Sequence, residues 1–214
     1  MSQPHRPTPL TELQLRQLTP ALHRGAIEAS SALARWLGKP TTMAINTVDQ
    51  CPLAQAMQVL GEGDQAICMC LMQMELSLTG HMLLAFDDAS GLAVADLLLN
   101  RPSGTSTNWG DVERSCILET MNIAGSAYLN GIADHMGELS RQSLQLIPTP
   151  PIFMRDFAES LLETAFLEQA AAGNDVVFTL AEFDLAGQPL RWTFLLIPDP
   201  PSLQKLADLL AANH

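Results

Sequence analysis

The sequence has 214 residues, a formal net charge of −12 at pH 7 and an apolar content of 47%. This length is enough for one domain, or for two half-size repeats that share a core, to bury that core without disulfide bonds. The negative charge opposes binding to the phosphate backbone of nucleic acids and to anionic membrane surfaces, so the sequence predicts neither partner.

The first half of the chain begins with a lead-in and a helix. Residues 1–9 contain three prolines and few apolar residues, which predicts a disordered segment. Apolar residues at helical spacing predict a helix over residues 10–37, broken or restarted at Pro20 because proline lacks a backbone N–H. The patterns that follow predict a strand at 41–48, a helix at 52–60, strands at 66–79 and 82–86 that turn at Gly80, and a helix at 89–99 capped by Asp88.

The second half shows the same order of elements. Residues 101–110 are rich in Gly, Ser and Thr, which predicts a linker between the two halves. Asp111 is predicted to cap a long helix that runs to about residue 136, with Glu113 near its positive end. The remaining patterns predict a strand at 143–147, a helix at 153–171, strands at 176–183 and 191–197 that turn at Gly187, and a helix at 202–212.

An internal similarity supports a division into two halves. LLAFDDASGLAVADLL from Leu83 resembles FLLIPDPPSLQKLADLL from Phe194, and both indicate a strand, an acidic turn and an amphipathic helix. Strand–turn–helix units occur by chance in any α/β protein, but the shared order of elements favours a duplication. We therefore predict an α/β (α+β) fold in which residues 10–214 form one domain of two halves, about 10–100 and 111–214.

A row of polar residues follows one side of the helix predicted from residue 111. At about 100° per residue its members share one face; they are Ser115, Glu119, Asn122 and Ser126. The opposite face is apolar, as a helix packed on a sheet requires. A solvated helix face is the ordinary explanation of such a row. However, Asn122 and Gly125 both lower helix propensity, Gly125 by about 1 kcal/mol relative to alanine, which favours a surface of close approach.

These residues carry a family resemblance. The spacing Ser115-x3-Glu119-x2-Asn122 resembles the Ser/Asp-x3-Glu-x2-Asn helix signature of the CheC, CheX and FliY phosphatases. The segments LTGHMLLAFDDASGLAVADLLL and LRWTFLLIPDPPSLQKLADLL also look like parts of that family, so the resemblance covers about residues 10–210. It implies a mainly antiparallel sheet with packed helices and two pseudo-symmetric halves.

The resemblance also implies a function, which is removal of the phosphoryl group from the phospho-aspartate of a CheY-like response regulator in chemotaxis or two-component signalling. Asn122 would orient the attacking water, much as a glutamine does in GTPases, and Glu119 would pair with the receiver's lysine. Ser115 and Ser126 would support binding at the rim. This chain would need no cofactor, since the Mg²⁺ belongs to the receiver domain. A CheD-like partner and a homodimer are left open.

The first helix departs from the signature. An ungapped alignment places Arg16, Pro20 and His23 opposite Ser115, Glu119 and Asn122, so neither the acid nor the amide is repeated. The family's proline after the signature corresponds to Pro148 or Pro150, at a slightly longer spacing. These departures leave an alternative open, which is a non-catalytic adaptor that binds a response regulator or a structural protein like those of the flagellar switch.

Other chemistries find less support in the sequence. The cysteines form no CxxC pair and have no histidine at a metal-ligand spacing, which predicts reduced core thiols; they are Cys51, Cys68, Cys70 and Cys116. Gly61-Glu62-Gly63 lacks the third spaced glycine of a dinucleotide loop and is interpreted as a turn. With no signal peptide and no apolar run of about 20 residues, the sequence predicts a cytoplasmic protein.

Overall fold

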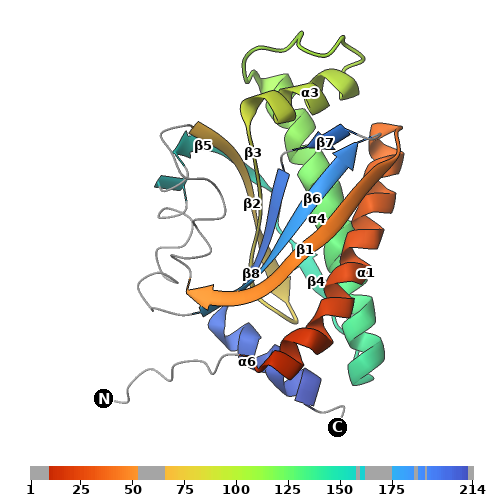
Figure 1. Cartoon of the computed structure of the whole chain (residues 1–214), viewed down its shortest axis with the longest axis vertical. Helices are drawn as coiled ribbons and strands as arrows, with labels where there is room; N and C mark the ends of the chain where they lie inside the picture. The colour runs from red at the N-terminus through yellow and green to blue at the C-terminus, as the bar shows by residue number, and fades with distance from the viewer. Residues whose placement is uncertain are drawn as a thin grey trace.

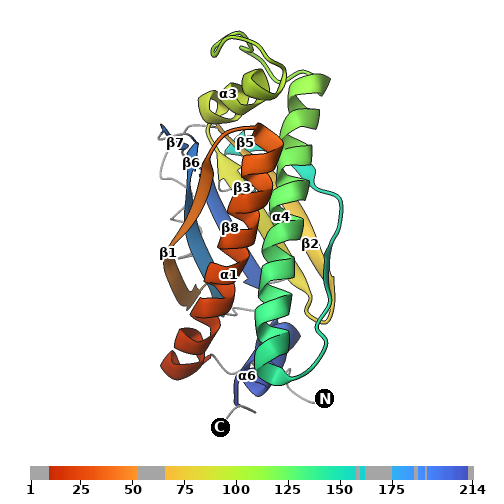
Figure 2. The same cartoon turned by 90° about the vertical axis from the view of Figure 1, so that its right-hand side faces the viewer.

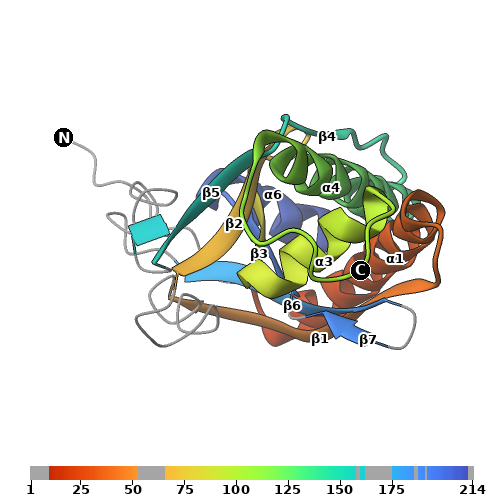
Figure 3. The same ribbon diagram turned by 90° about the horizontal axis from the view of Figure 1, so that it is seen from above.

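The computed structural model of the chain describes residues 10–52, 66–157, 160–161, 175–185, 188–190 and 192–211. Two long helices, α1 (Glu12–Leu37) and α4 (Asp111–Ser140), stand side by side against the strands (Figure 2). The strands curve around one side of this helix pair (Figure 3). The α+β fold predicted from the sequence is confirmed.

Every ladder between the described strands is antiparallel. One sheet contains β4 (Leu146–Pro148), β2 (Ala66–Leu76), β3 (Gly80–Phe86) and β8 (Trp192–Pro198) in that order, and β5 (Ile152–Phe157) also pairs with β2. The other has the order β1 (Thr41–Pro52), β6 (Asp175–Leu185) and β7 (Gln188–Leu190). The two sheets meet where β6 lies beside β8 (Figure 1).

The core lies between the helix pair and the sheets. Alternate residues of the central strands face the helices, as the period of a strand requires, and Met72 and Met74 of β2 are among them. The intervening residues Met69, Leu83 and Leu195 belong to a smaller cluster on the other face. The methionines of β2 therefore fill the core.

Two shorter helices close the ends of the molecule. α3 (Asp88–Leu98) follows β3 at one end, and α6 (Pro200–Ala211) follows β8 at the other (Figure 1). These are the two strand–turn–helix segments that resemble each other in sequence. Superposition of the ADLL at Ala95 on the ADLL at Ala207 also superposes Leu83 on Leu195, and these two leucines are partners in the β3–β8 ladder. The division into two halves stays a prediction, which this pairing supports.

The prediction that Pro20 breaks the first helix is wrong. α1 begins with a capping box, in which Thr11 Oγ1 accepts from Gln14 N at 3.2 Å and Gln14 Oε1 accepts from Thr11 N at 2.8 Å, and it continues through Pro20. Pro20 lies on the exposed side of the helix, where water can bond the carbonyl group of Arg16 that the missing N–H leaves free. Burial of the opposite face against α4 offsets the cost.

Two helix caps differ from prediction by one residue. Asp87 rather than Asp88 is the N-cap of α3, and its Oδ1 accepts from Ser90 N at 2.7 Å. Gly110 rather than Asp111 precedes α4, and Asp111 is the first residue of that helix. In sequence, either of two adjacent aspartates can be an N-cap, and so can a small residue that precedes an aspartate. The backbone conformation of the folded chain decides which residue takes that position.

The helix predicted over residues 153–171 is wrong in its first part. Residues 152–157 form β5, which pairs with β2 from Ile152 opposite Leu71 to Phe157 opposite Ala66. Residues 162–171 lie outside the described residues, as do most of the predicted helix at 52–60, the turns at Gly61 and Gly187, and the lead-in at 1–9. The other predicted strands and the last helix are found close to the expected residues.

Gly80 starts β3 rather than forming the turn itself. Its φ is +150°, and a Cβ there would clash with the carbonyl oxygen of Ile197 and with Pro198 on β8. Only glycine combines this backbone conformation with so close an approach of the neighbouring strand.

Candidate functional site

The polar row of α4 lies on the outer side of the helix pair. Ser115 and Glu119 are exposed, whereas Asn122 and Ser126 are half-buried. The apolar residues of the opposite face, Ile117, Met121, Ala124 and Tyr128, are buried. The structure thus brings the four predicted site residues to one face of one helix, with Asn122 about 4.5 Å further along the axis than Glu119.

Gly125 is explained by packing inside the molecule. A Cβ at Gly125 would lie 2.9 Å from Met72 Sδ and 3.2 Å from Met82 Cε, so α4 approaches the sheet closely there. The close approach at Gly125 is to the sheet inside the molecule rather than to a partner on the polar face. Gly125 therefore adds no support to a site on the outer face.

The helices α1 and α4 also approach each other closely. A Cβ at Gly131 would lie 2.8 Å from Gly25 Cα, and one at Gly25 would lie 2.7 Å from the carbonyl oxygen of Tyr128. Beyond this crossing, Trp36 Nε1 of α1 donates to Thr120 Oγ1 of α4 at 3.1 Å. The helices are therefore antiparallel, and the last turn of α1 lies beside the part of α4 that carries Glu119.

Aromatic residues and charges flank the row on the side of β5. The Arg114 guanidinium lies 5.8 Å from the centre of the Phe153 ring. The Trp109 ring contacts the Phe153 ring in a tilted arrangement, with 4.9 Å between centroids and 46° between the ring planes. Trp109 Nε1 also donates to Asp88 Oδ1 at 2.7 Å. Asp88 also pairs with Arg155 of β5. The first turn of α4 is thus held against β5.

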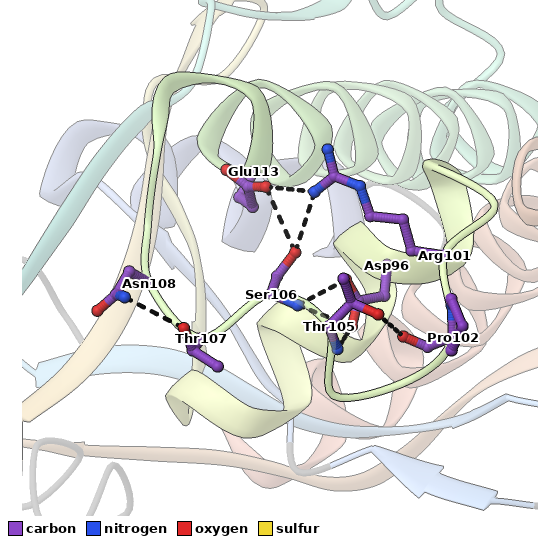
Figure 4. A network of polar contacts seen from close by, with 8 residues as sticks. All are labelled: Asp96, Arg101, Pro102, Thr105, Ser106, Thr107, Asn108 and Glu113. Atoms are coloured by element: carbon purple, nitrogen blue, oxygen red, sulfur yellow. Dashed lines mark hydrogen bonds and ion pairs between the residues drawn. The ribbon is translucent and has the colours of Figure 1, made fainter.

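The loop over residues 101–110 is organised by a network of polar contacts (Figure 4). The carboxylate of buried Asp96 accepts from Thr105 N at 2.9 Å and from Ser106 N at 3.0 Å, and the hydrogen bonds from Ser106 and Thr105 lower its pKa. Arg101 Nη1 donates to Glu113 Oε1 at 2.8 Å. The pKa of Glu113 is lowered by a hydrogen bond from its own backbone N–H and by Arg101. This network connects α3 to the start of α4.

The corresponding positions of the first helix are also at the surface. Arg16, Pro20 and His23 are exposed on α1, and Arg16 Nη2 lies 3.8 Å from Glu12 Oε2. This face offers a cation, a proline ring and an imidazole in place of an acid and an amide. It cannot supply the Glu–Asn chemistry predicted for α4.

Neither the cysteines nor the other potential metal ligands among the described residues form a second candidate centre. Cys51, Cys68 and Cys70 are buried, and Cys116 is half-buried. Within the described ranges, no three His, Cys, Asp or Glu side chains are grouped as ligands of a metal ion. Of the helices in the same ranges, none has the length and hydropathy of a membrane span.

Sequence reasoning overlooked the residues beside the row. Trp36 and Thr120 lie on the α1 side of α4 and Arg114 lies on the β5 side, and none of the three matches the signature. One signal was present, because Gly25, Ala29, Ala32 and Trp36 follow one another at helical spacing on α1. Three small residues at helical spacing indicate that this side of α1 packs closely on another helix. The large tryptophan that follows them indicates where this close contact ends.

Comparison with solved structures identifies the fold. FliY of Thermotoga maritima matches with a TM-score of 0.74 at 16% identity, over 96% of this chain and 99% of that chain. The FliM middle domain of H. pylori matches with 0.65 at 13% identity, over 94% and 99%. A chain of the CheX–CheY–BeF3–Mg²⁺ complex of Borrelia burgdorferi matches with 0.51 at 13% identity, over 83% and 97%.

These likenesses confirm the fold that the helix signature predicted, which FliY, the FliM middle domain and CheX-type proteins share. No protein-family model matches the sequence, and no curated protein matches it. At these identities the likeness concerns the fold, and the chemistry has to be argued from the residues of α4.

Proposed function

We propose that this chain hydrolyses the aspartyl phosphate of a CheY-like receiver domain, with Glu119 and Asn122 as the catalytic residues. The observation that carries this proposal is their common position on the outer face of α4, a helix packed on its inner side against α1 and the sheet. The fold adds support, since a chain with the same fold is found in a complex with CheY. An acid and an amide one turn apart can enter a partner's site together.

The proposed step needs little more than positioning. The oxygen of a water molecule attacks the phosphorus, the bond between phosphorus and the aspartate oxygen breaks, and the aspartate leaves as a carboxylate. The proton of the water passes to the phosphate product. Because phosphoryl transfer has a loose transition state, correct alignment of the water supplies much of the acceleration. The carboxamide of Asn122 can both accept from and donate to that water.

Glu119 has a different role in this proposal. Its carboxylate pairs with the lysine of the receiver's active site, which fixes the orientation in which Asn122 enters that site. Ser115 and Ser126, which lie on the same face, contact the receiver at the rim. The Mg²⁺ that neutralises the phosphoryl group is held by the receiver, so this chain supplies no metal ligand. The reaction takes place in the cytoplasm.

Loss of the aspartyl phosphate tests the proposal directly. Receivers from the same organism are phosphorylated with a small phosphodonor, and the decay is followed with the wild type, Glu119→Ala and Asn122→Ala. The wild type shortens the lifetime of the phosphate and both variants lose most of this effect. A receiver that binds the wild type without any change in lifetime contradicts the catalytic proposal.

A second candidate is a non-catalytic protein, either an adaptor that binds a receiver or a structural component like those of the flagellar switch. The fit to the FliM middle domain, with a TM-score of 0.65, exceeds the fit to the chain of the CheX–CheY complex, with 0.51. The absence of the acid and the amide at Pro20 and His23 of α1 also favours it. In the same assay this candidate gives binding and an unchanged lifetime.

A further inference from the structure

Trp36 occupies an unusual position at the end of α1. Its side chain lies on the side of α1 that faces α4, yet it remains 38% exposed. By comparison, Trp192 is 2% exposed and Trp109 is partly buried. A large aromatic side chain on the surface is costly to leave in water and is enriched at sites of protein contact. The exposed part of this ring is therefore a candidate contact area for a protein partner.

The ring is held in place by the site helix itself. Its Nε1–H donates to Thr120 Oγ1 at 3.1 Å, and Thr120 Oγ1 donates to the carbonyl oxygen of Cys116 at 2.7 Å. Thr120 is fully buried and directly follows Glu119 in the chain. The indole is therefore fixed on the side of α4 that carries Thr120, about 100° around the helix from Glu119. Because its only donor is already used, its exposed part offers apolar area alone.

We propose that Trp36 is the apolar anchor of the receiver-binding surface, an inference that rests on the proposed function. An aliphatic or aromatic side chain of the receiver, next to its active-site lysine, packs on the exposed part of the indole while the lysine pairs with Glu119. The charges are complementary at Glu119, and the apolar contact lies beside it. The occupant of this surface is thus the face of a receiver domain that carries the lysine.

The fixed ring has an energetic advantage. A side chain that is already ordered in the free protein loses little conformational entropy on binding, so more of the contact contributes to affinity. Buried tryptophans at the centre of an interface are among the residues whose removal weakens binding most. Trp36 should therefore affect the affinity for the receiver, and Asn122 the rate of hydrolysis once the receiver is bound.

The test uses the full chain and a receiver activated with beryllofluoride and Mg²⁺, which gives a stable analogue of the phosphorylated state. Binding is measured by calorimetry for the wild type, Trp36→Ala, Trp36→Phe and a control, Ile27→Ala, which removes a 58% exposed apolar side chain elsewhere on α1. We expect Trp36→Ala to weaken binding about tenfold or more, Trp36→Phe only a few-fold and Ile27→Ala not at all. In the hydrolysis assay Trp36→Ala should raise the receiver concentration needed for half-maximal turnover about tenfold, whereas Ile27→Ala should leave it unchanged.

A second measurement uses the wild type alone. Acrylamide quenches the fluorescence of exposed tryptophans, so in the wild type it reports mainly on Trp36, and the activated receiver should protect that signal. Unchanged affinity in Trp36→Ala, or unchanged quenching in the complex, overturns the proposal that Trp36 is an anchor. The proposed function is tested separately, and it stands if the wild type hydrolyses the phosphate and Asn122→Ala does not. A chain that neither binds nor dephosphorylates any receiver overturns both proposals.

Discussion

Asp88 at the start of α3 and Arg155 on β5 form a two-pronged ion pair, with Arg155 Nε 2.9 Å from Asp88 Oδ1 and Nη2 2.7 Å from Oδ2. Trp109 Nε1 and the Cys68 thiol donate to the same carboxylate. The hydrogen bonds from Arg155, followed by those from Trp109 and Cys68, hold the pKa of Asp88 well below its usual range. One carboxylate thus joins β2, α3, β5 and the loop before α4.

Asp88→Asn should lower the free energy of unfolding by about 1–2 kcal/mol at neutral pH, a modest value because the ion pair is partly exposed to solvent. The lowered pKa means that folding favours the ionised form. Its contribution is therefore complete above the ordinary aspartate pKa of about 3.9 and is lost as the pH falls below that value.

Urea denaturation of the wild type and Asp88→Asn at pH 7, 5 and 3 measures this dependence. Asp134→Asn, at an exposed position of α4, serves as the control and should change stability little at any of the three values. The gap between the wild type and Asp88→Asn should be similar at pH 7 and 5 and smaller at pH 3. An equal gap at pH 3 contradicts the assignment.

The crossing of α1 and α4 should tolerate no side chain at Gly131. In Gly131→Ala the new Cβ meets backbone atoms of Gly25 and Arg24, which can move only if the helices separate. We expect a loss of about 1–3 kcal/mol. Gly125→Ala, whose Cβ meets the flexible ends of Met72 and Met82, should cost less. Thermal unfolding of the two variants compares them directly, and the opposite order would contradict the geometry.

The four thiols should differ in reactivity. Burial raises the pKa of Cys116, Cys68 and Cys70, that of Cys70 to about 12, and a hydrogen bond to Asp88 further raises that of Cys68. At pH 8 a disulfide reagent should therefore modify Cys116 slowly and leave the other thiols intact until the chain unfolds. Mass spectrometry locates the label. Labelling of Cys68 or Cys70 in the folded protein would show that the core opens more readily than its packing indicates.

Arg114, held over Phe153 beside the polar row, should assist association with a receiver if the proposed function is correct. The aspartyl phosphate is negatively charged, so Arg114→Glu should lower the association rate about tenfold at low ionic strength. Arg16→Glu, an exposed charge change on α1, is the matched control. Stopped-flow measurements should show the difference shrinking in 0.5 M salt. Equal effects of the two variants would mean that only the net charge matters.

Much of the fold could be predicted because its elements have clear local patterns. The alternation of buried and exposed residues around Met72 and Met74 on β2 is one example. The failures occur where tertiary contacts decide. β5 becomes a strand because β2 pairs with it and because Asp88 holds Arg155, and neither contact is visible in the local sequence. Pro20 is accommodated because it faces solvent on a helix whose other side is buried.

The candidate site, too, could be predicted only in part. The row from Ser115 to Ser126 could be predicted, since a single helix and its period place all of its residues. The flanks could not, because Trp36 and Phe153 reach α4 from elements distant in the sequence. Whether Glu119 and Asn122 act on a phosphate stays a prediction that the assays above address.

The pairing of Leu83 with Leu195 suggests how such a chain can arise. A half-turn that exchanges these leucines also exchanges β3 with β8 and α3 with α6. A shorter ancestor that assembled in pairs would bring the same leucine together with its copy, and a gene fusion would preserve that contact. In a fused chain one long helix would be enough to carry the acid and the amide, and the other helix would be free to lose them. On this view, Pro20 and His23 of α1 stand where a second copy of the acid and the amide has been lost.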